Sequence, residues 1–343
     1  MESRLTPVEN RKTLQGTWTK AFEEVDLLDI HRPFSIPVPN AVKNYRIKEW
    51  VTFTIQDDRY IFNARLCNVK YYRTAYVTMF DIETKERQVF SKAIPGGGWG
   101  LPRFLNNSSV DSHSLGFFFR IHSWLDANRV TLDLKIDPRR NRPAFTSHTT
   151  FDLAAGTTTP MVVSLLFSEN RNMYAYKALT AVRGSVVSGG QYIHFDPAKT
   201  TGLFCDFKGY YPYRMRCSWC TGMGFDKQNR RFGFSLGENQ AKETYRNNEN
   251  ALWIDGRLTP LPPVKITRYG DTDSDWIIQD LEGMVDLVFT PKAPGRITRN
   301  LIFAASDYEN PLGVFNGTLV NSDGEKLPID DVWGTCEKLF LRV

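Results

Sequence analysis

A chain of 343 residues is too long for one small barrel and long enough for two domains that each bury their own core. Hydrophobic residues make up 41% and charged residues 24%, which is typical of a soluble globular protein, and no apolar run approaches the roughly 20 residues that span a bilayer. The net charge of +5 is spread along the chain, so we expect no membrane span and no nucleic-acid partner.

The first 16 residues are polar and charged, without the basic start and apolar stretch of a secretory signal. This pattern predicts a cytoplasmic location. The five cysteines are an odd number, thinly spread through a chain that is large enough not to need disulfides. We therefore expect reduced thiols. The sequence leaves the oligomeric state open.

The regular elements begin with residues 14–29, whose acidic, mixed pattern predicts a short helix or an arm. Residues 51–55 then alternate, with apolar side chains at 51, 53 and 55 and threonines between them. Residues 117–124 and 130–136 alternate in the same way, and the short connection between them predicts a hairpin. Alternation with period two is the signature of strands with a buried face.

One face of the predicted strand at residues 117–124 carries Phe118, Arg120, His122 and Trp124. Such a face is either solvated or directed into a polar pocket, since small barrels with an open mouth line it with side chains of this kind. We retain His122 and Trp124 as candidate substrate-binding residues.

Turn formers interrupt the alternation at residues 187–190 and 196–202. We place a domain boundary there, with residues 1–199 and residues 200–343 each forming one barrel. Later strands alternate at residues 232–236 and 285–289, and Asp-Gly turns recur between strands, while residues 238–245 predict a turn or two of helix. The predicted fold class is all-β, with two consecutive antiparallel barrels and few short helices.

Two cysteines, Cys217 and Cys220, have the spacing of a redox pair or of half a zinc site. If this segment is a strand, residues three apart point to opposite faces, so the thiols diverge. No second pair of ligands is spaced to complete a tetrahedral site. We expect buried thiols, no metal and no cofactor.

The densest group of functional side chains runs from residue 205 to residue 255. Its two carboxylates, Asp206 and Glu249, come from separate segments and are the expected acid and base. Around them are the candidate substrate-binding residues Lys208, Tyr210, Tyr211, Trp219, Asn250 and Trp253. Aromatic rings beside amides and carboxylates suit a substrate with an apolar face and hydroxyl groups. The alternative is that both acids hold loops through backbone hydrogen bonds.

Several segments together resemble the family catalogued as domain of unknown function 2804. They are residues 46–50, residues 173–177, Asp206 to Gly209 with Trp219, and the block at residues 248–256 followed by residues 261–264. That family is distantly similar to tandem lipocalin-like proteins, which include carotenoid hydratases, AttH-like proteins and fungal cyclases of the Diels-Alder type. The resemblance implies two calycin-type barrels with a site inside or between them.

Three functions remain open from the sequence. The first is a metal-independent lyase or hydrolase that acts on a small organic substrate, either a glycoside or an isoprenoid-like molecule, by carboxylate acid/base chemistry in a barrel pocket. The second is a non-catalytic carrier or sensor of a hydrophobic small molecule. The third is an interaction scaffold without a pocket. Convergence of Asp206 and Glu249 on one cavity would favour the enzyme.

Overall fold

Alternating sequence patterns become strands along almost the whole chain in the computed structural model, which describes residues 6–70, 72–95, 100–140, 142–153, 158–300 and 305–342. The described strands form two curled antiparallel sheets, apart from a small ribbon of β1 (Val8–Glu9) and β2 (Lys12–Thr13). The predicted all-β fold of two consecutive barrels is therefore confirmed. None of the helices in the described part of the chain is long and apolar enough to cross a membrane.

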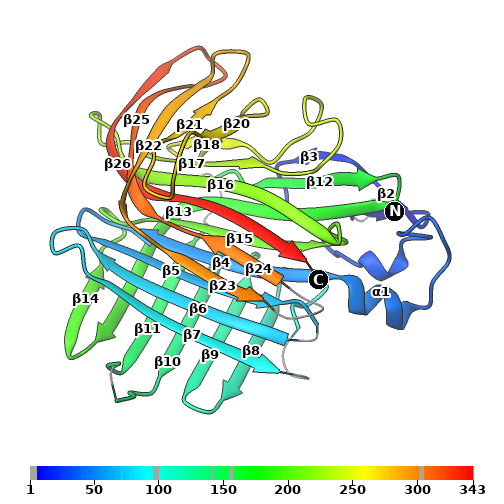
Figure 1. Ribbon diagram of the computed structural model, residues 1–343, viewed down its shortest axis with the longest axis horizontal. Coiled ribbons are helices and arrows are strands. Elements are labelled where there is room, and N and C mark those ends of the chain that lie inside the picture. Colours follow the sequence, from blue (N-terminus) through cyan, green and yellow to red (C-terminus); the bar gives the residue numbers. More distant parts are fainter. Residues whose placement is uncertain are drawn as a thin grey trace.

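The first sheet, blue to green in Figure 1, forms the first barrel. Its strands are β3 (Gly16–Trp18), β4 (Lys48–Gln56), β5 (Tyr60–Asn68), β6 (Tyr72–Asp81), β7 (Arg87–Pro95), β8 (Ser108–Ser114), β9 (Phe117–Trp124), β10 (Arg129–Ile136), β11 (Phe145–Asp152), β12 (Met161–Ser168), β13 (Arg171–Ser188), β14 (Gln191–Phe195) and β15 (Thr201–Gly209). The main order is β7-β6-β5-β4-β15-β13-β11-β10-β9-β8, with β12 and β14 also paired to β13 and β3 paired to β12.

The second sheet, yellow-green to red in Figure 1, forms the second barrel and lies over β4 and β15. Its strands are β16 (Arg214–Phe225), β17 (Arg231–Glu238), β18 (Ala251–Ile254), β19 (Arg257–Pro260), β20 (Lys265–Arg268), β21 (Trp276–Gln279), β22 (Val285–Ala293), β23 (Arg296–Asn300), β24 (Ala305–Glu309), β25 (Leu312–Val320) and β26 (Lys326–Arg342). The order is β19-β18-β17-β16-β26-β25-β22-β21-β20, with β24 joining β26 to β23.

The division between the barrels follows from strand pairing. Residue 200, where the sequence predicts the boundary, precedes β15, and β15 pairs along its length with β4 and β13 of the first barrel. The second sheet begins at Arg214. We propose that the two units divide at residues 210–213.

The helix predictions were less accurate than the strand predictions. Residues 14–29 contain β3 and only a three-residue 3-10 helix, η1 (Leu27–Asp29), and residues 239–245 form turns without a helix. The α-helix in the described chain is α1 (Asn40–Arg46), which the sequence analysis did not predict. The buried Lys43 ammonium donates to the carbonyls of Leu28 and Ile30, at 2.8 and 2.7 Å, and so fixes η1 against α1.

The alternation of side chains along each strand determines which residues face the first barrel and which face the second. On β4, Val51, Phe53 and Ile55 enter the core of the first barrel as predicted, whereas Thr52 and Thr54 point toward the second barrel. Both faces of β4 are buried because a second sheet covers the outer one. The inner faces of β17 and β22 form the core of the second barrel in the same way.

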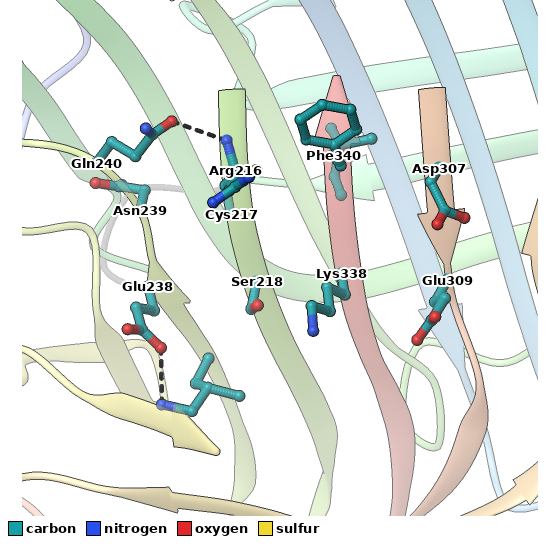
Figure 2. A pocket seen from close by; sticks show the side chains of 12 residues that line it. Arg216, Cys217, Ser218, Glu238, Asn239, Gln240, Asp307, Glu309, Lys338 and Phe340 are labelled. Carbon is teal, nitrogen blue, oxygen red and sulfur yellow. Dashed lines mark hydrogen bonds between the residues drawn. The ribbon is translucent and has the colours of Figure 1, made fainter. Parts of the chain in front are cut away.

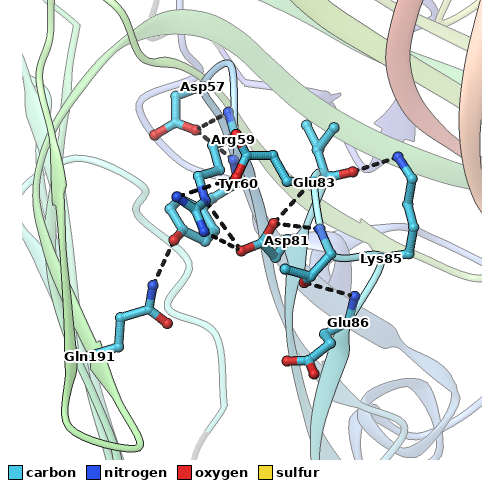
Figure 3. Close-up of polar contacts among 10 residues, drawn as sticks. Asp57, Arg59, Tyr60, Asp81, Glu83, Lys85, Glu86 and Gln191 are labelled. Carbon is cyan, nitrogen blue, oxygen red and sulfur yellow. Dashed lines mark hydrogen bonds and ion pairs between the residues drawn. The ribbon is translucent and has the colours of Figure 1, made fainter.

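Polar contacts tie together the turns at one end of the first barrel (Figure 3). The Asp57 carboxylate accepts from the backbone N–H groups of Arg59 and Tyr60, and the Arg59 guanidinium donates to Asp81 at 3.1 Å. The Tyr60 hydroxyl accepts from Gln191 at 2.7 Å. Three hairpins that are distant in sequence are therefore linked at this end, opposite to the end that α1 and η1 cover.

Candidate active site

A cavity of about 90 Å³ lies between the two barrels and is called the interbarrel cavity here. Strands β4, β5 and β15 form one wall, and β16, β17 and β26 form the other. The lining residues are Trp50, Thr52, Thr54, Asn63, Arg65, Cys67, Leu203, Cys205, Phe207, Trp219, Thr221, Ser235, Thr335, Glu337, Leu339 and Leu341. A largely apolar hollow at a domain interface, with a few convergent polar groups, is the usual setting of a small-molecule site.

An ion pair between the barrels stands in the wall of this cavity. The Arg65 guanidinium of the first barrel lies 2.5 Å from the Glu337 carboxylate of the second, and the Arg65 and Glu337 side chains are 19% and 9% exposed. The Tyr308 hydroxyl hydrogen-bonds Glu337, and Arg65 lies over the Tyr308 ring at 4.8 Å. Burial raises the pKa of the Tyr308 hydroxyl well above its ordinary value. Glu337 is thus a carboxylate held between a cation and a neutral donor.

A second ion pair between the barrels is completely buried. The Lys177 ammonium on β13 lies 2.7 Å from the Glu249 carboxylate, and each side chain is only 1% exposed. Lys177 also donates to the Ser235 hydroxyl at 3.1 Å. Glu249 accepts from Asn239 at 2.6 Å and from the Trp219 indole at 3.4 Å. Trp219 and Ser235 line the cavity. The Lys177–Glu249 ion pair, which contacts both of them, therefore holds part of the cavity wall in place from the side away from the cavity.

Aromatic rings give the interbarrel cavity its apolar side. The Trp50 ring stacks on Phe207 at 5.3 Å between ring centroids and packs on Tyr211 at 4.6 Å and edge-on against Trp219 at 6.3 Å. Burial raises the pKa of the Tyr211 hydroxyl well above its ordinary value, so this phenol stays neutral. Packed rings of this kind offer a flat surface to an apolar group.

The structure does not bring Asp206 to this cavity. Asp206 pairs across the sheet with Tyr176, and both side chains lie on the face of their strands that turns into the first barrel, whereas Cys205 and Lys177 lie on the face toward the second. Asp206 and Glu249 are therefore on opposite sides of the first sheet. Burial raises the pKa of Asp206 to about 6, although Lys208 acts in the opposite direction.

This raised pKa predicts a specific pH dependence of stability. A carboxyl whose pKa is higher in the folded state stabilises the fold below its unfolded pKa, and this contribution is lost as the pH rises through the folded value. Asp206→Asn removes the titration, so the wild-type free energy of unfolding minus that of the variant should fall by about 2 kcal/mol between pH 4 and pH 7. Urea unfolding across that range measures it. A difference that stays constant across that range would contradict it.

The other predicted residues divide among three places. Lys208 and Tyr210 belong to the first barrel, where the Tyr210 hydroxyl donates to the Leu27 carbonyl at 2.9 Å. Trp253 is fully buried between the barrels and donates to the Thr159 carbonyl at 2.8 Å. Asn250 fixes a loop by accepting from the Gly237 N–H and donating to the Pro262 carbonyl.

His122 and Trp124 lie on the outer face of β9, opposite the buried Phe117, Phe119 and Ile121. Their rings contact each other at 4.6 Å, and Trp124 also packs under the Arg129 guanidinium. Neither residue lines the interbarrel cavity, so the structure does not join them to the other candidates.

Four residues of the site were not predicted as functional: Trp50, Arg65, Lys177 and Glu337. Trp50 and Lys177 stand in segments that carry the family resemblance. A usable signal was present in the sequence, because Arg65 is the one cation of β5, and Lys177 is the one cation in the buried run of β13 between Arg171 and Arg183. Such a charge needs a partner.

The two cysteines with metal-like spacing diverge as strand alternation predicts. Cys217 packs in the layer between the barrels, and Cys220 lies in the core of the second barrel. Among the residues that the structure describes, no three His, Cys, Asp or Glu side chains gather where they could hold a metal ion.

A larger hollow of about 600 Å³ lies on the face of β16 and β26 that turns toward the second barrel (Figure 2). Arg216, Ser218, Lys338 and Phe340 point into it. Its three carboxylates are already engaged: Glu238 with Lys265, Asp307 with Arg296 and Glu309 with Arg268. Most residues that line this hollow are charged or polar, whereas the interbarrel cavity presents largely apolar surface, so the interbarrel cavity remains the candidate site.

Solved structures resemble the chain in fold. A crystal structure of CghA matches with a TM-score of 0.56 and 11% identity, covering 86% of this chain and 88% of that one. A crystal structure of kievitone hydratase from Nectria haematococca matches with a TM-score of 0.52 and 14% identity, covering 85% and 88%. These likenesses confirm the lipocalin-like fold. No curated protein matches the chain. Residues 10–342 match the family described as domain of unknown function (DUF2804), so the protein belongs to that family.

Proposed function

We propose that the protein is a metal-independent lyase or hydrolase, and that it acts on a small organic substrate in the interbarrel cavity by proton transfer to a carboxylate. The observation that carries this proposal is the Arg65–Glu337 pair, a cation and a carboxylate 2.5 Å apart in the cavity wall. Two charged groups from different barrels meet where an otherwise apolar hollow could hold a substrate, and such groups in a cleft are functional candidates.

The geometry supports a role for each group. Glu337, beside the Arg65 cation in the cavity wall, is the proposed proton acceptor. Once Glu337 holds a proton, Arg65 can stabilise negative charge that develops on a substrate oxygen. Glu249 is a positioning residue, because it holds the Trp219 indole without lining the cavity.

Addition of water to an unsaturated carbonyl compound is the reaction that best fits these groups. Glu337 accepts a proton from water, the water oxygen bonds to the carbon remote from the carbonyl, and the carbonyl oxygen becomes an enolate beside Arg65. Glu337 then returns its proton to the carbon next to the carbonyl, which balances the reaction. The solved structure titled kievitone hydratase supports water addition, and so a lyase rather than a hydrolase.

The size and lining of the cavity restrict the substrate. About 90 Å³ is less than the roughly 150 Å³ cavity that accepts benzene, so the reacting part is small. Trp50, Leu203 and Phe207 present apolar surface, which favours an isoprenoid-like group over a glycoside.

The carrier alternative has weaker support. Phe53, Phe62, Phe90, Phe119 and Phe145 are completely buried in the core cluster of the first barrel, where the Phe145 ring contacts Phe62 and Phe90. A ligand inside that barrel would have to displace them. The packed interior favours the interbarrel cavity as the place for a small molecule.

The test is a hydration assay with 3-methylbut-2-enal, an unsaturated aldehyde with one isoprene unit. We expect NMR to detect protein-dependent formation of 3-hydroxy-3-methylbutanal. The same assay is applied to a panel of small unsaturated ketones and acids, each followed by its own hydration product. Rates equal to those of buffer for every member of the panel would contradict the proposal.

A further inference from the structure

Two cysteines lie directly opposite each other in the core of the second barrel. Cys220 on β16 pairs across the sheet with Cys336 on β26, and their Sγ atoms are 2.7 Å apart. Both side chains are completely buried. The structure describes all five cysteines, and these are the two whose sulfur atoms contact each other. The spatial partner of Cys220 is therefore Cys336 rather than Cys217.

The register of the strands places the two cysteines within reach of a disulfide. Residues directly opposite in an antiparallel pair have Cα atoms about 4.5 or 5.5 Å apart, and both values lie in the usual range for disulfides, roughly 4.4 to 6.8 Å. Residues 214–222 pair without interruption with residues 334–342. The cysteines therefore stay opposite each other as long as the second barrel is folded.

The two sulfur atoms are closer than packing alone requires. Carbon atoms in van der Waals contact are about 3.5–4.0 Å apart, and sulfur is the larger atom. A disulfide bond is about 2.05 Å long. The observed Sγ–Sγ distance of 2.7 Å lies between these values. A covalent bond would need only a small further approach of the two side chains.

We propose that Cys220 and Cys336 form a disulfide, and that the oxidant is a small disulfide such as oxidised glutathione. One cysteine thiolate attacks the oxidant, which forms a mixed disulfide and releases one small thiol. The other cysteine thiolate then attacks the protein sulfur of the mixed disulfide, which closes the bond and releases the second small thiol. The two thiol protons pass to the released thiols, so two protein thiols are oxidised and one small disulfide is reduced.

Burial determines when this reaction can take place. Both side chains are 0% exposed, so an oxidant does not reach either sulfur in the folded barrel. Burial and the contact with Cys220 also raise the pKa of the Cys336 thiol well above its ordinary value, and the thiolate is the form that reacts. We therefore expect the disulfide to form while the second barrel folds.

The disulfide would lie directly behind the wall of the interbarrel cavity. On one side of the cysteine pair, Trp219 pairs with Glu337, and on the other side Thr221 pairs with Thr335. All four of these side chains line the cavity. The bond would therefore join β16 to β26 at the part of the sheet that presents them. The inference does not depend on the proposed function, because thiols can be counted without a substrate.

The experiment compares two ways of refolding the full chain. The protein is unfolded in urea with a reductant and then refolded either with the reductant or with oxidised glutathione. N-ethylmaleimide then labels the remaining thiols in urea, and mass spectrometry counts the labels. We expect all five cysteines to be labelled after refolding in reductant, and two fewer after refolding with oxidised glutathione. Peptide mapping should show Cys220 joined to Cys336.

The matched control is Cys217→Ala, which removes the other cysteine of the Cys-x-x-Cys spacing and keeps the proposed pair. This variant should still form the disulfide, whereas Cys220→Ala and Cys336→Ala should have every remaining cysteine labelled. The bridged wild type should also unfold about 5 °C or more above its dithiol form, because the bond joins residues that are 116 positions apart in the sequence.

Circular dichroism shows whether each protein is folded. Labelling of all five cysteines in the wild type after refolding with oxidised glutathione would overturn the proposal. A disulfide that persists in Cys336→Ala, or that is lost in folded Cys217→Ala, would overturn it because the pairing would then be a different one. A bridged protein that unfolds no higher than the dithiol form would show that the folded barrel does not favour the bond, and would also overturn it.

Discussion

Replacing Glu337 with glutamine is expected to lower the rate of water addition by about 10²- to 10⁴-fold, the usual contribution of a general base. Glutamine keeps the shape of the side chain and can still accept from Arg65 and Tyr308, but it cannot take a proton. The measurement is the initial rate at saturating 3-methylbut-2-enal, or at saturating concentration of the best substrate in the panel.

The matched control is Glu325→Gln. Glu325 also pairs with an arginine, Arg230 at 2.6 Å, but it lies at the surface before β26 and far along the strand from the cavity. The control should retain the wild-type rate. A Glu337→Gln protein that is folded and retains more than half of the wild-type rate would show that Glu337 is not the base.

Replacing Lys177 with methionine is expected to destabilise the protein by about 3–5 kcal/mol, which is typical when one partner of a buried ion pair is removed. The reason is that the Glu249 carboxylate, only 1% exposed, would be left buried without its cation. Urea unfolding at pH 7.5 measures the loss. Lys227→Met is the control, because the Lys227–Asp330 pair is 84% and 67% exposed and should contribute about 0–1 kcal/mol.

The double variant Lys177→Met with Glu249→Leu separates this cause from a simple packing defect. It removes the charges together, so it should be more stable than Lys177→Met alone. If the double variant is less stable than the single one, the unpaired carboxylate is not what destabilises the single variant.

Most of the fold could be predicted from the alternation of apolar and polar residues in the sequence. The pattern at residues 51–55 is correct in both faces, and the hairpin of β9 and β10 pairs as predicted. Cys217 and Cys220 diverge for the same reason. The short helix α1 was missed, since seven residues preceded by a proline give little helical periodicity.

The site was only partly predictable. Glu249 and Trp219 stand in a block dense in functional side chains, and the structure brings them together. Asp206 was misleading because both faces of β15 are buried, so the sequence does not show which face turns into the first barrel. Arg65 and Glu337 are 272 residues apart, so no local sequence pattern indicates that they are in contact.

Filling the interbarrel cavity with a bulky side chain shows whether the reaction takes place between the barrels. Thr221→Trp places an indole in the interbarrel cavity, and Ser218→Trp places the same side chain on the opposite face of the same strand. With both variants shown to be folded by near-ultraviolet circular dichroism, we measure hydration of 3-methylbut-2-enal. We expect Thr221→Trp to lose the activity and Ser218→Trp to keep it. Full activity in Thr221→Trp would show that the reaction takes place elsewhere.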